Sequence, residues 1–249
     1  MKYSFIIPYR DREDNLRALL SKLLPGLVGV DYEIIVAEQG DPISFCRANM
    51  FNEGARIATG DVFIFHDVDH VAQDTNLYFN QPTDVWLPMR ASDFVMNDFS
   101  PRPPEDIPQG YRHFKNAVDE NFFGGVLCIK REAFYKINGW NTEYRGWGME
   151  EADFRERCIR AKLSIGRSAE GRFWELYHEH VGLPGSDPRL QHNLILFHNR
   201  DQYLDKGINN SYKPTIVETQ PRIEGITKWI VVWYINDPKK SHIVFTRLD

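Results

Sequence analysis

The stretch DVFIFHDVDH, residues 61–70, joins a short apolar run to two aspartates that are separated by one residue. Aliphatic and aromatic residues fill positions 62–65, which predicts a buried strand over residues 61–67. Two strands of the same character are predicted upstream, over residues 3–7 and 32–37, and a helical segment separates each strand from the next. The order β-α-β-α-β over about seventy residues is typical of a parallel sheet with right-handed crossovers. The sequence therefore predicts an α/β fold.

The two segments between these strands carry their inward residues at helical spacing. The first segment ends at Pro25 and Gly26, and the second ends at Thr59 and Gly60. The inner faces that we expect consist of Leu16, Leu19, Leu20, Leu23 and Leu24 in the first helix and of Phe45, Ala48, Phe51, Asn52 and Ala55 in the second.

The later part of the chain is less regular. Residues 97–110 are rich in proline and acidic residues and are typical of a long surface loop. The segment NFFGGVLCI, residues 121–129, predicts a strand that begins at a glycine turn. Residues 151–163 predict a helix whose inward residues are Phe154, Cys158 and Ile159.

The end of the chain predicts a β-hairpin, with strands over residues 226–235 and 241–248. We find no internal repeat, low-complexity tract or linker, so we expect a single domain over residues 1–249. The first hairpin strand combines aromatic residues with nearby lysines. Contact with a membrane that bears a lipid-linked acceptor is therefore an alternative to a plain edge hairpin.

The composition limits the classes of function. A formal net charge of -5 argues against a nucleic-acid-binding protein, which needs clustered lysine and arginine. Three cysteines without CxxC spacing indicate reduced core thiols rather than a disulfide framework or a zinc site. The N-terminal apolar run is too short for a signal peptide, and no window reaches about 18 apolar residues. We therefore expect a cytoplasmic protein, with the inner face of the membrane as the alternative location.

Polar residues follow each of the three predicted parallel strands, at positions 8–12, 38–41 and 66–70. In such sheets ligands bind beyond the carboxyl ends of the strands. No GxGxxG follows the first strand, so arginines and a metal ion would have to neutralise a bound phosphate. Arg10 and Arg12 alternate at the first strand end, which would let both reach a pyrophosphate; surface ion pairing is the alternative.

The predicted third strand ends in an Asp-x-Asp motif. Asp67 and Asp69 would lie on the same side of an extended segment, with Val68 turned into the sheet, so both carboxylates could reach one divalent ion. The alternative is that the two aspartates only terminate the strand and bind no metal ion. His66 and His70 flank the motif and are expected to be hydrogen-bonding groups rather than ligands.

A second candidate metal segment is WELYHEH, with Glu175, His178 and His180. The two histidines are two residues apart and would share one face of a strand, although exposed loop histidines are the alternative. Aspartate oxygens together with an imidazole nitrogen would favour Mn²⁺ over Mg²⁺.

The segment GWGMEEADF, residues 146–154, combines glycines, an indole and acids. Glu150, Glu151 and Asp153 would fall in the first turn of a helix, where the helix dipole stabilises negative charge. An ionised carboxylate beside Trp147 would suit a general base that faces a sugar hydroxyl.

Seven stretches in this order resemble the β-1,4-galactosyltransferase family, whose members are glycosyltransferases of the GT-A fold. They are FIIPYRDREDNL, AEQGDPISFCRANMFNEG, FHDVDH, FFGGVLCIKREAFYKINGW, YRGWGMEEADF, GRFWELYH and DKGINNSY. The resemblance covers nearly the whole chain. It implies a Rossmann-like nucleotide-sugar-binding fold, with a mixed central sheet flanked by helices.

The resemblance also implies roles for individual residues. Asp69, His178 and Glu175 would hold Mn²⁺, with Mg²⁺ as a second possibility, and Trp147 would close over the donor on a glycine-hinged lid. Glu150 and Glu151 would meet the acceptor, with Glu151 as the base. The residues that would hold the UDP-sugar are Pro8, Arg10, Arg12, Phe45, Arg47, Asp67, Val68, Asp69, Gly125 and Trp147.

Three positions depart from the family pattern. Glu151 stands where relatives usually carry aspartate, and Glu175 stands where they carry a methionine ligand. Phe122 lacks the hydroxyl of a tyrosine that bears on the choice between galactose and its N-acetyl form. The donor is therefore expected to be UDP-galactose or UDP-GalNAc, and a harder ion site would broaden tolerance to Mg²⁺.

These observations predict an inverting, metal-dependent transfer of galactose or GalNAc to a hydroxyl of a saccharide acceptor, forming a β-1,4 linkage. A retaining UDP-GalNAc transferase could share the same UDP and metal apparatus. A sugar-binding module without activity is the alternative from another class, and the glutamate at position 151 makes it conceivable.

Overall fold

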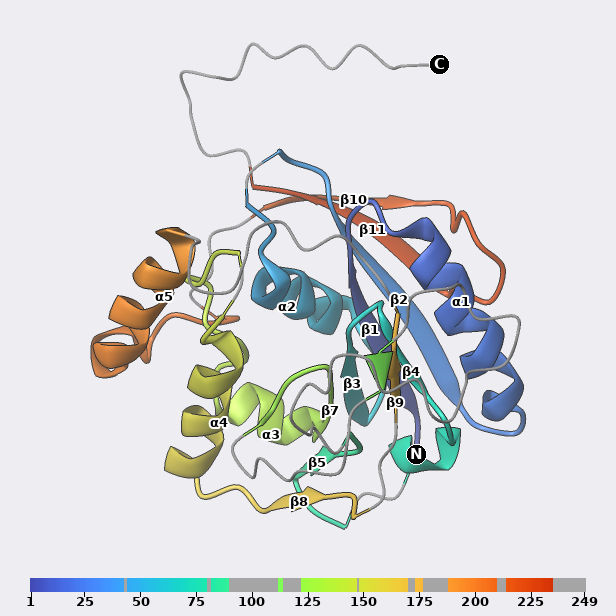
Figure 1. Cartoon of the computed structure of the whole chain (residues 1–249), viewed down its shortest axis with the longest axis horizontal. Coiled ribbons are helices and arrows are strands. Elements are labelled where there is room, and N and C mark those ends of the chain that lie inside the picture. The colour runs from blue at the N-terminus through green and yellow to red at the C-terminus, as the bar shows by residue number, and fades with distance from the viewer. Residues whose placement is uncertain are drawn as a thin grey trace.

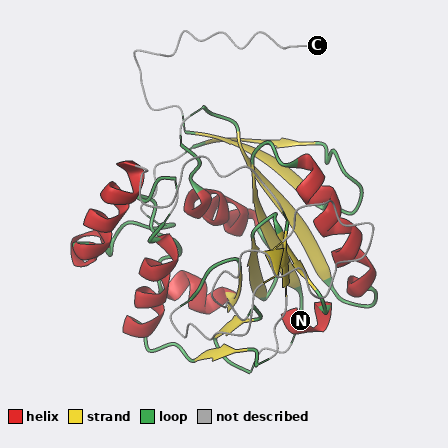
Figure 2. Cartoon of the chain, in the orientation of Figure 1, coloured by secondary structure: helices red, strands yellow, loops and turns green. Residues whose placement is uncertain are grey.

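The computed structural model describes most of the chain, and its elements are drawn in Figure 1 and Figure 2. The described residues are 1–42, 44–79, 82–89, 112–113, 122–146, 148–169, 173–176, 188–209 and 214–234.

An eight-stranded mixed sheet forms the centre of the molecule, in the order β10-β11-β2-β1-β3-β7-β5-β8. Its middle is parallel, because β1 pairs in parallel with β2 and with β3, and β11 pairs in parallel with β2. β7 runs antiparallel to β3. The strands are β1 (Tyr3–Tyr9), β2 (Tyr32–Gln39), β3 (Val62–His66), β5 (Val85–Leu87), β7 (Val126–Lys130), β8 (Ile165–Arg167), β10 (Thr215–Thr219) and β11 (Lys228–Trp233).

A second, three-stranded sheet has the order β4-β9-β6, with β4 at His70–Ala72, β9 at Phe173–Glu175 and β6 at Arg112–His113. β4 begins four residues after β3 ends, so the Asp-x-Asp motif lies in the turn between the two sheets.

Helices cover both faces of the central sheet, with α1 on one side and α2, α3 and α4 on the other (Figure 1). Their bounds are α1 (Glu13–Leu23), α2 (Arg47–Ile57), α3 (Arg131–Lys136), α4 (Glu150–Arg160) and α5 (Pro188–His198); short 3₁₀ turns are η1 (Leu24–Leu27), η2 (Thr75–Tyr78) and η3 (Arg200–Tyr203).

Strand alternation explains why both faces are apolar. Phe5 and Ile7 belong to one core cluster with the α1 leucines, whereas Ile6 between them belongs to the other cluster with Phe51 of α2. The three strands and two helices predicted in the first 67 residues are confirmed, with one change: α2 begins at Arg47, so Phe45 precedes the helix and is half-buried.

Two expectations about the later elements need correction. Ile159 was expected to point inward but is 43% exposed, because Phe154 and Cys158 share the buried face of α4 and the next residue turns away from it. The strand predicted over 226–235 is confirmed as β11, but it is not at an edge. It pairs with β10 on one side and β2 on the other, and the predicted partner over 241–248 lies outside the described residues.

Among the residues that the structure describes, no helix combines the length and the apolar character needed to span a bilayer. The predicted loop over 97–110 lies outside the described residues.

Candidate active site

The turn after β3 gathers three side chains that could hold a metal ion, and we call it the metal-binding turn. Ligand atoms of Asp67, Asp69 and His70 all lie within 4.8 Å of one another. Val68 is buried, as expected for a residue turned toward the core. The predicted convergence of the two aspartates at the carboxyl end of the third strand is therefore confirmed, and an imidazole joins them.

Both oxygens of Asp69 have partners. Arg12 donates from Nη1 to Oδ2 at 2.9 Å, and Nδ1 of His70 lies 2.8 Å from Oδ1. His66 takes the role expected of a flanking histidine, because its ring nitrogens contact the Tyr78 hydroxyl and the Asp67 carbonyl. Burial lowers the pKa of His66 to about 3, so it stays neutral.

The expected alternation of Arg10 and Arg12 is wrong. β1 ends at Tyr9, and Asp11 adopts a φ of 53°, so the segment is not extended beyond the strand. Arg12 turns to Asp69, whereas the Arg10 guanidinium lies 5.3 Å from the centre of the Phe45 ring. A positively charged group and an aromatic ring therefore stand together at the sheet edge.

Arg47, the first residue of α2, connects three carboxylates. Its Nη1 donates to Asp67 Oδ2 at 2.5 Å, its Nη2 donates to Glu151, and its Nε lies 3.6 Å from Glu150 Oε1. The guanidinium also lies 5.4 Å from the centre of the Phe51 ring. The acids that follow the third strand and those that begin α4 thus meet at one cation.

Burial gives this cluster unusual electrostatics. It raises the pKa of Asp67 to about 6 and that of Glu150 to about 7, against the opposing attraction of Arg47. Burial alone would lower the pKa of Arg47, but the surrounding carboxylates outweigh it and raise the pKa above its ordinary value. Asp67 Oδ1 and Glu150 Oε2 are buried without a hydrogen-bond partner among the described residues. A divalent ion at Asp67 would satisfy one of these oxygens and favour its charged form.

The glycines of the FFGG segment let backbone approach this cluster. A Cβ on Gly124 would lie 2.9 Å from Glu151 Oε1, and one on Gly125, whose φ is 73°, would lie 3.1 Å from His70 Nε2. Only a residue without a side chain fits in both places. The segment therefore runs between Glu151 and the metal-binding turn.

The residues just before α4 adopt left-handed backbone conformations. Gly146, Gly148 and Met149 all have positive φ, of 66°, 105° and 72°. Asn193 of α5 donates to the carbonyls of Arg145 and Gly148 and so holds both sides of this segment. Glu150, Glu151 and Asp153 occupy the first turn of α4, as predicted.

β9 pairs the described start of the second candidate metal segment with β4, beside the Asp-x-Asp turn. His70 is in register with Glu175, and the Leu176 amide donates to the Asp69 carbonyl at 2.6 Å. His178 follows Leu176 by two residues. Trp147, His178, His180 and the side chain of Glu175 lie outside the described residues, so their expected roles stay predictions.

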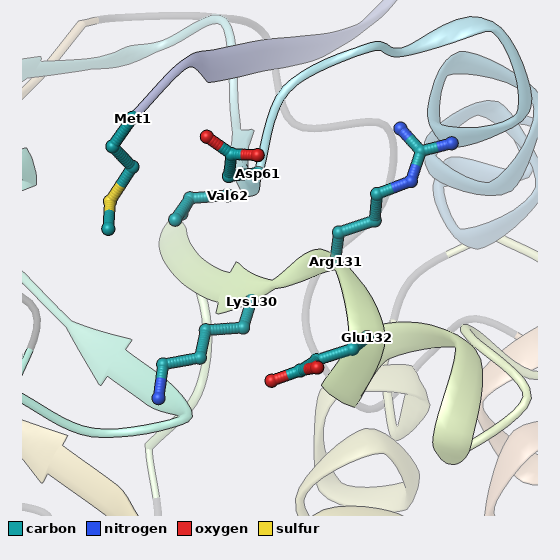
Figure 3. A pocket seen from close by; sticks show the side chains of 6 residues that line it. All are labelled: Met1, Asp61, Val62, Lys130, Arg131 and Glu132. Atoms are coloured by element: carbon teal, nitrogen blue, oxygen red, sulfur yellow. The ribbon is translucent and has the colours of Figure 1, made fainter.

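A pocket of about 340 Å³ lies at the other end of the sheet, where β3 begins and β7 ends. Its cations are engaged locally: Lys130 pairs with Asp84 at 3.1 Å, and Arg131 donates to the Ala58 carbonyl. Figure 3 shows the Arg131 guanidinium directed away from the Lys130 ammonium. The lining residues are Met1, Asp61, Val62, Lys130, Arg131 and Glu132.

Sequence reasoning anticipated the Asp-x-Asp turn and the acids of α4 but missed two contacts. Nothing in the sequence joined Arg47 to the acids of α4, of which Glu151 is 104 positions away. His70 was treated as a flanking group, although its position next to Asp69 was a usable signal. Only the Arg47 contacts are pairings that the tertiary structure alone creates.

Two family profiles match the chain. Residues 1–81 match the N-terminal region of glycosyl transferase group 7, and residues 111–179 match a profile described as the N-terminal domain of galactosyltransferase. Together they include the sheet edge, the metal-binding turn and the start of α4.

Individual proteins show the same likeness. The chain is 28% identical to human β-1,4-galactosyltransferase 4 and 32% identical to the rat enzyme, in each case over 91% of this chain and 62% of the relative. It is 35% identical to a β-N-acetyl-D-glucosaminide β-1,4-N-acetylglucosaminyltransferase of Lymnaea stagnalis, over 73% of this chain and 35% of the relative. The chain therefore spans less than two thirds of the length of these relatives.

Solved structures agree on the fold. The catalytic domain of Drosophila β-1,4-galactosyltransferase 7, in complex with xylobiose, superposes with a TM-score of 0.71 at 23% identity, and the alignment covers 93% of each chain. A mutant of that enzyme in complex with manganese, UDP-galactose and xylobiose gives a TM-score of 0.68 at 22% identity, also over 93% of each chain. These likenesses confirm the predicted GT-A fold, with its mixed sheet between helices.

Proposed function

The chain belongs to glycosyl transferase group 7, the family that includes the β-1,4-galactosyltransferases, and on this premise we propose that it transfers galactose or GalNAc from a UDP-sugar to a saccharide hydroxyl. The transfer inverts the anomeric configuration and forms a β-1,4 linkage. The observation that carries this proposal is the Arg47 cluster, which brings the Asp-x-Asp turn and the acids of α4 together at the carboxyl edge of the sheet.

The residues present fit a divalent cation. Asp67 keeps a buried oxygen without a hydrogen-bond partner among the described residues, and Asp69 lies beside it. We propose that Asp69 binds Mn²⁺, together with His178 and Glu175, and that Mg²⁺ is a weaker substitute. When bound, the cation offsets the negative charge that grows on the departing diphosphate.

The donor site lies at the ends of β1 and α2. Pro8 is the next-to-last residue of β1, and the Arg10 guanidinium that follows the strand lies 5.3 Å from the centre of the Phe45 ring, a pair that suits the base and ribose of UDP. Arg12 forms an ion pair with Asp69, so its guanidinium would be within reach of a diphosphate that the metal ion holds. Val68 and Gly125 would contribute backbone at this edge, and Trp147 would cover the sugar.

We propose that Glu151 acts as the general base. Its carboxylate accepts a hydrogen bond from Arg47, and its side chain is partly exposed. It takes the proton of the acceptor hydroxyl while that oxygen bonds to the anomeric carbon and the bond to UDP breaks on the opposite face. Glu150, buried beside it, would orient the sugars.

The location, the acceptor and the domain organisation form part of the same proposal. One sheet draws its strands from positions 3 to 233, which supports a single domain over residues 1–249. We propose a cytoplasmic enzyme whose acceptor is a saccharide. A lipid-linked acceptor and peripheral membrane contact stay alternatives, and the buried Trp229, Ile230 and Val232 of β11 give them little surface in the described part of that segment.

A screen of UDP release over several UDP-sugars tests the proposal. The purified chain is incubated with a panel of saccharide acceptors and with Mn²⁺, with Mg²⁺ or with a chelator. We expect release from UDP-galactose or UDP-GalNAc with Mn²⁺, weaker release with Mg²⁺, and none with the chelator. Sugar binding without UDP release from any donor would instead indicate a binding module, and an α-linked product by NMR would contradict inversion.

A further inference from the structure

We propose that His70 is a ligand of the divalent cation and supplies an imidazole nitrogen next to Asp67 and Asp69. The proposal rests on the proposed function in one respect, namely that this turn binds a cation. It goes further by assigning a ligand that lies within the Asp-x-Asp turn itself, in addition to the predicted His178.

The backbone of the turn brings His70 to the ligand side. Asp69 and His70 are sequence neighbours, and on a regular strand their side chains would point to opposite faces. Here the His70 amide donates to the Asp67 carbonyl at 3.3 Å and closes a turn over residues 67–70. Nδ1 of His70 consequently lies 2.8 Å from Asp69 Oδ1, and each of the two residues has a ligand atom within 4.8 Å of an oxygen of Asp67.

This spacing suits two ligands of one ion. In octahedral coordination with bonds near 2.1 Å, neighbouring ligand atoms are about 3 Å apart. The 2.8 Å between Nδ1 and Oδ1 matches such an edge as well as it matches a hydrogen bond. The cation can therefore enter between groups that are already in place, and only the proton on Nδ1 has to leave.

The ring has little freedom to turn elsewhere. His70 is only 8% exposed, and its Nε2 edge faces Gly125, where an added Cβ would lie 3.1 Å away. Pairing of β4 with β9 holds the backbone of His70 in register with Glu175. A ring packed in this way presents Nδ1, rather than Nε2, to the two aspartates.

An imidazole ligand from His70 would affect which divalent metal ion the site prefers. Imidazole suits transition metals, whereas Mg²⁺ prefers oxygen and water. A carboxylate at position 175 would make the ion site harder. His70 would compensate and keep the preference for Mn²⁺.

Electron paramagnetic resonance of bound Mn²⁺ tests the assignment without any turnover. Nitrogen hyperfine coupling in the spin-echo modulation reports imidazole ligands directly. The decisive sample carries His178→Gln and His180→Gln, so that His70 is the remaining candidate near the ion. We expect nitrogen coupling to persist in that variant and to disappear when His70→Asn is added. Its absence before His70 is changed would overturn the proposal.

Mn²⁺ affinity distinguishes a ligand from a group that only orients Asp69. Asparagine can still donate a hydrogen bond to Asp69, but it offers no imidazole nitrogen. We expect His70→Asn in the otherwise unchanged chain to weaken Mn²⁺ binding by about 10- to 100-fold. Unchanged affinity would contradict a ligand role. The control is His192→Gln, on the exposed face of α5, which should leave both readouts unchanged.

The two proposals can fail separately. If the unchanged chain binds Mn²⁺ with UDP but His70→Asn alters neither the spectrum nor the affinity, only the His70 assignment is wrong. If the unchanged chain binds no Mn²⁺, even with UDP present, the proposed metal-dependent function is wrong and the assignment is wrong with it. Circular dichroism of each variant confirms that the fold is retained.

Discussion

The two ends of the central sheet carry similar charged residues but hold them differently. At the amino end, around the pocket of Figure 3, Lys130 pairs with Asp84 while the two side chains are 38% and 31% exposed. At the carboxyl end, Arg47 is 15% exposed and faces Asp67, Glu150 and Glu151. One end therefore has a solvated pair, whereas the other has a buried cation shared by three acids.

The difference lies in the balance of charge as well as in burial. The described part of the carboxyl edge gathers four carboxylates, those of Asp67, Asp69, Glu150 and Glu151, around Arg12 and Arg47. Burial raises the pKa of Asp67, the neighbouring acids add to that shift, and the excess of acids favours an added cation. The amino end has no such excess among its lining residues, since Lys130 and Arg131 stand beside Asp61 and Glu132. We therefore expect metal binding and catalysis at the carboxyl end of the sheet.

The largest effect is expected from Glu151→Gln, which removes the base and keeps the shape of the side chain. Loss of general base catalysis should lower the turnover number by about 10²- to 10⁴-fold. UDP binding, measured by calorimetry with Mn²⁺, should stay unchanged. The matched control is Glu156→Gln on the same helix, where the carboxylate pairs with Arg155 and turnover should not change. Full activity of Glu151→Gln would exclude Glu151 as the base.

The outcome of the sequence predictions follows the same division between local and distant contacts. The strand before the Asp-x-Asp motif was predictable, because β-branched and aromatic residues fill it and the two aspartates come directly after it in the sequence. The acids in the first turn of α4 were predictable for the same local reason. The Arg47 cluster was not, because it joins residues from three elements, and no spacing in the sequence encodes which carboxylates a guanidinium will meet.

Local patterns also failed where the backbone left its regular course. The alternation expected for Arg10 and Arg12 assumed an extended chain, but Asp11 adopts positive φ just beyond β1. Ile159 was assigned inward from its apolar character, although Phe154 and Cys158 already fill the buried face of α4. A positive φ that the pattern does not contain set the directions of Arg10 and Arg12, whereas strict helical spacing would have turned Ile159 away from the face of Phe154 and Cys158.

A stability comparison between the two ends should give the next largest effect. Arg47→Met leaves three carboxylates without their buried cation, and breaking a buried ion pair typically costs about 3 to 5 kcal/mol in the free energy of unfolding. Lys130→Met, at the solvated end, should cost about 0 to 1 kcal/mol. Urea unfolding with a chelator present measures both. Equal losses for the two variants would show that the burial difference between the ends has no energetic consequence.

The smallest effect concerns pH, and its sign should differ between the ends. Burial raises the pKa of Glu150 to about 7, so the folded state takes up a proton more readily than the unfolded state. Stability should therefore rise as the pH falls from about 7 toward the unfolded value of about 4.3, and Glu150→Gln should remove part of that rise.

Hydrogen bonds from the backbone amide and hydroxyl of Ser164, together with Lys130, lower the pKa of Asp84 to about 2. Asp84 should therefore stabilise the fold above about pH 3.9 and lose this contribution as the pH falls toward 2, and Asp84→Asn should flatten that acid limb. Urea midpoints across this pH range, with a chelator present, report both slopes. Burial raises the pKa of the carboxyl at one end, and hydrogen bonding at the surface lowers the pKa of the carboxyl at the other. If the contributions of Glu150 and Asp84 to stability changed with pH in the same direction, the comparison between the two ends would be wrong.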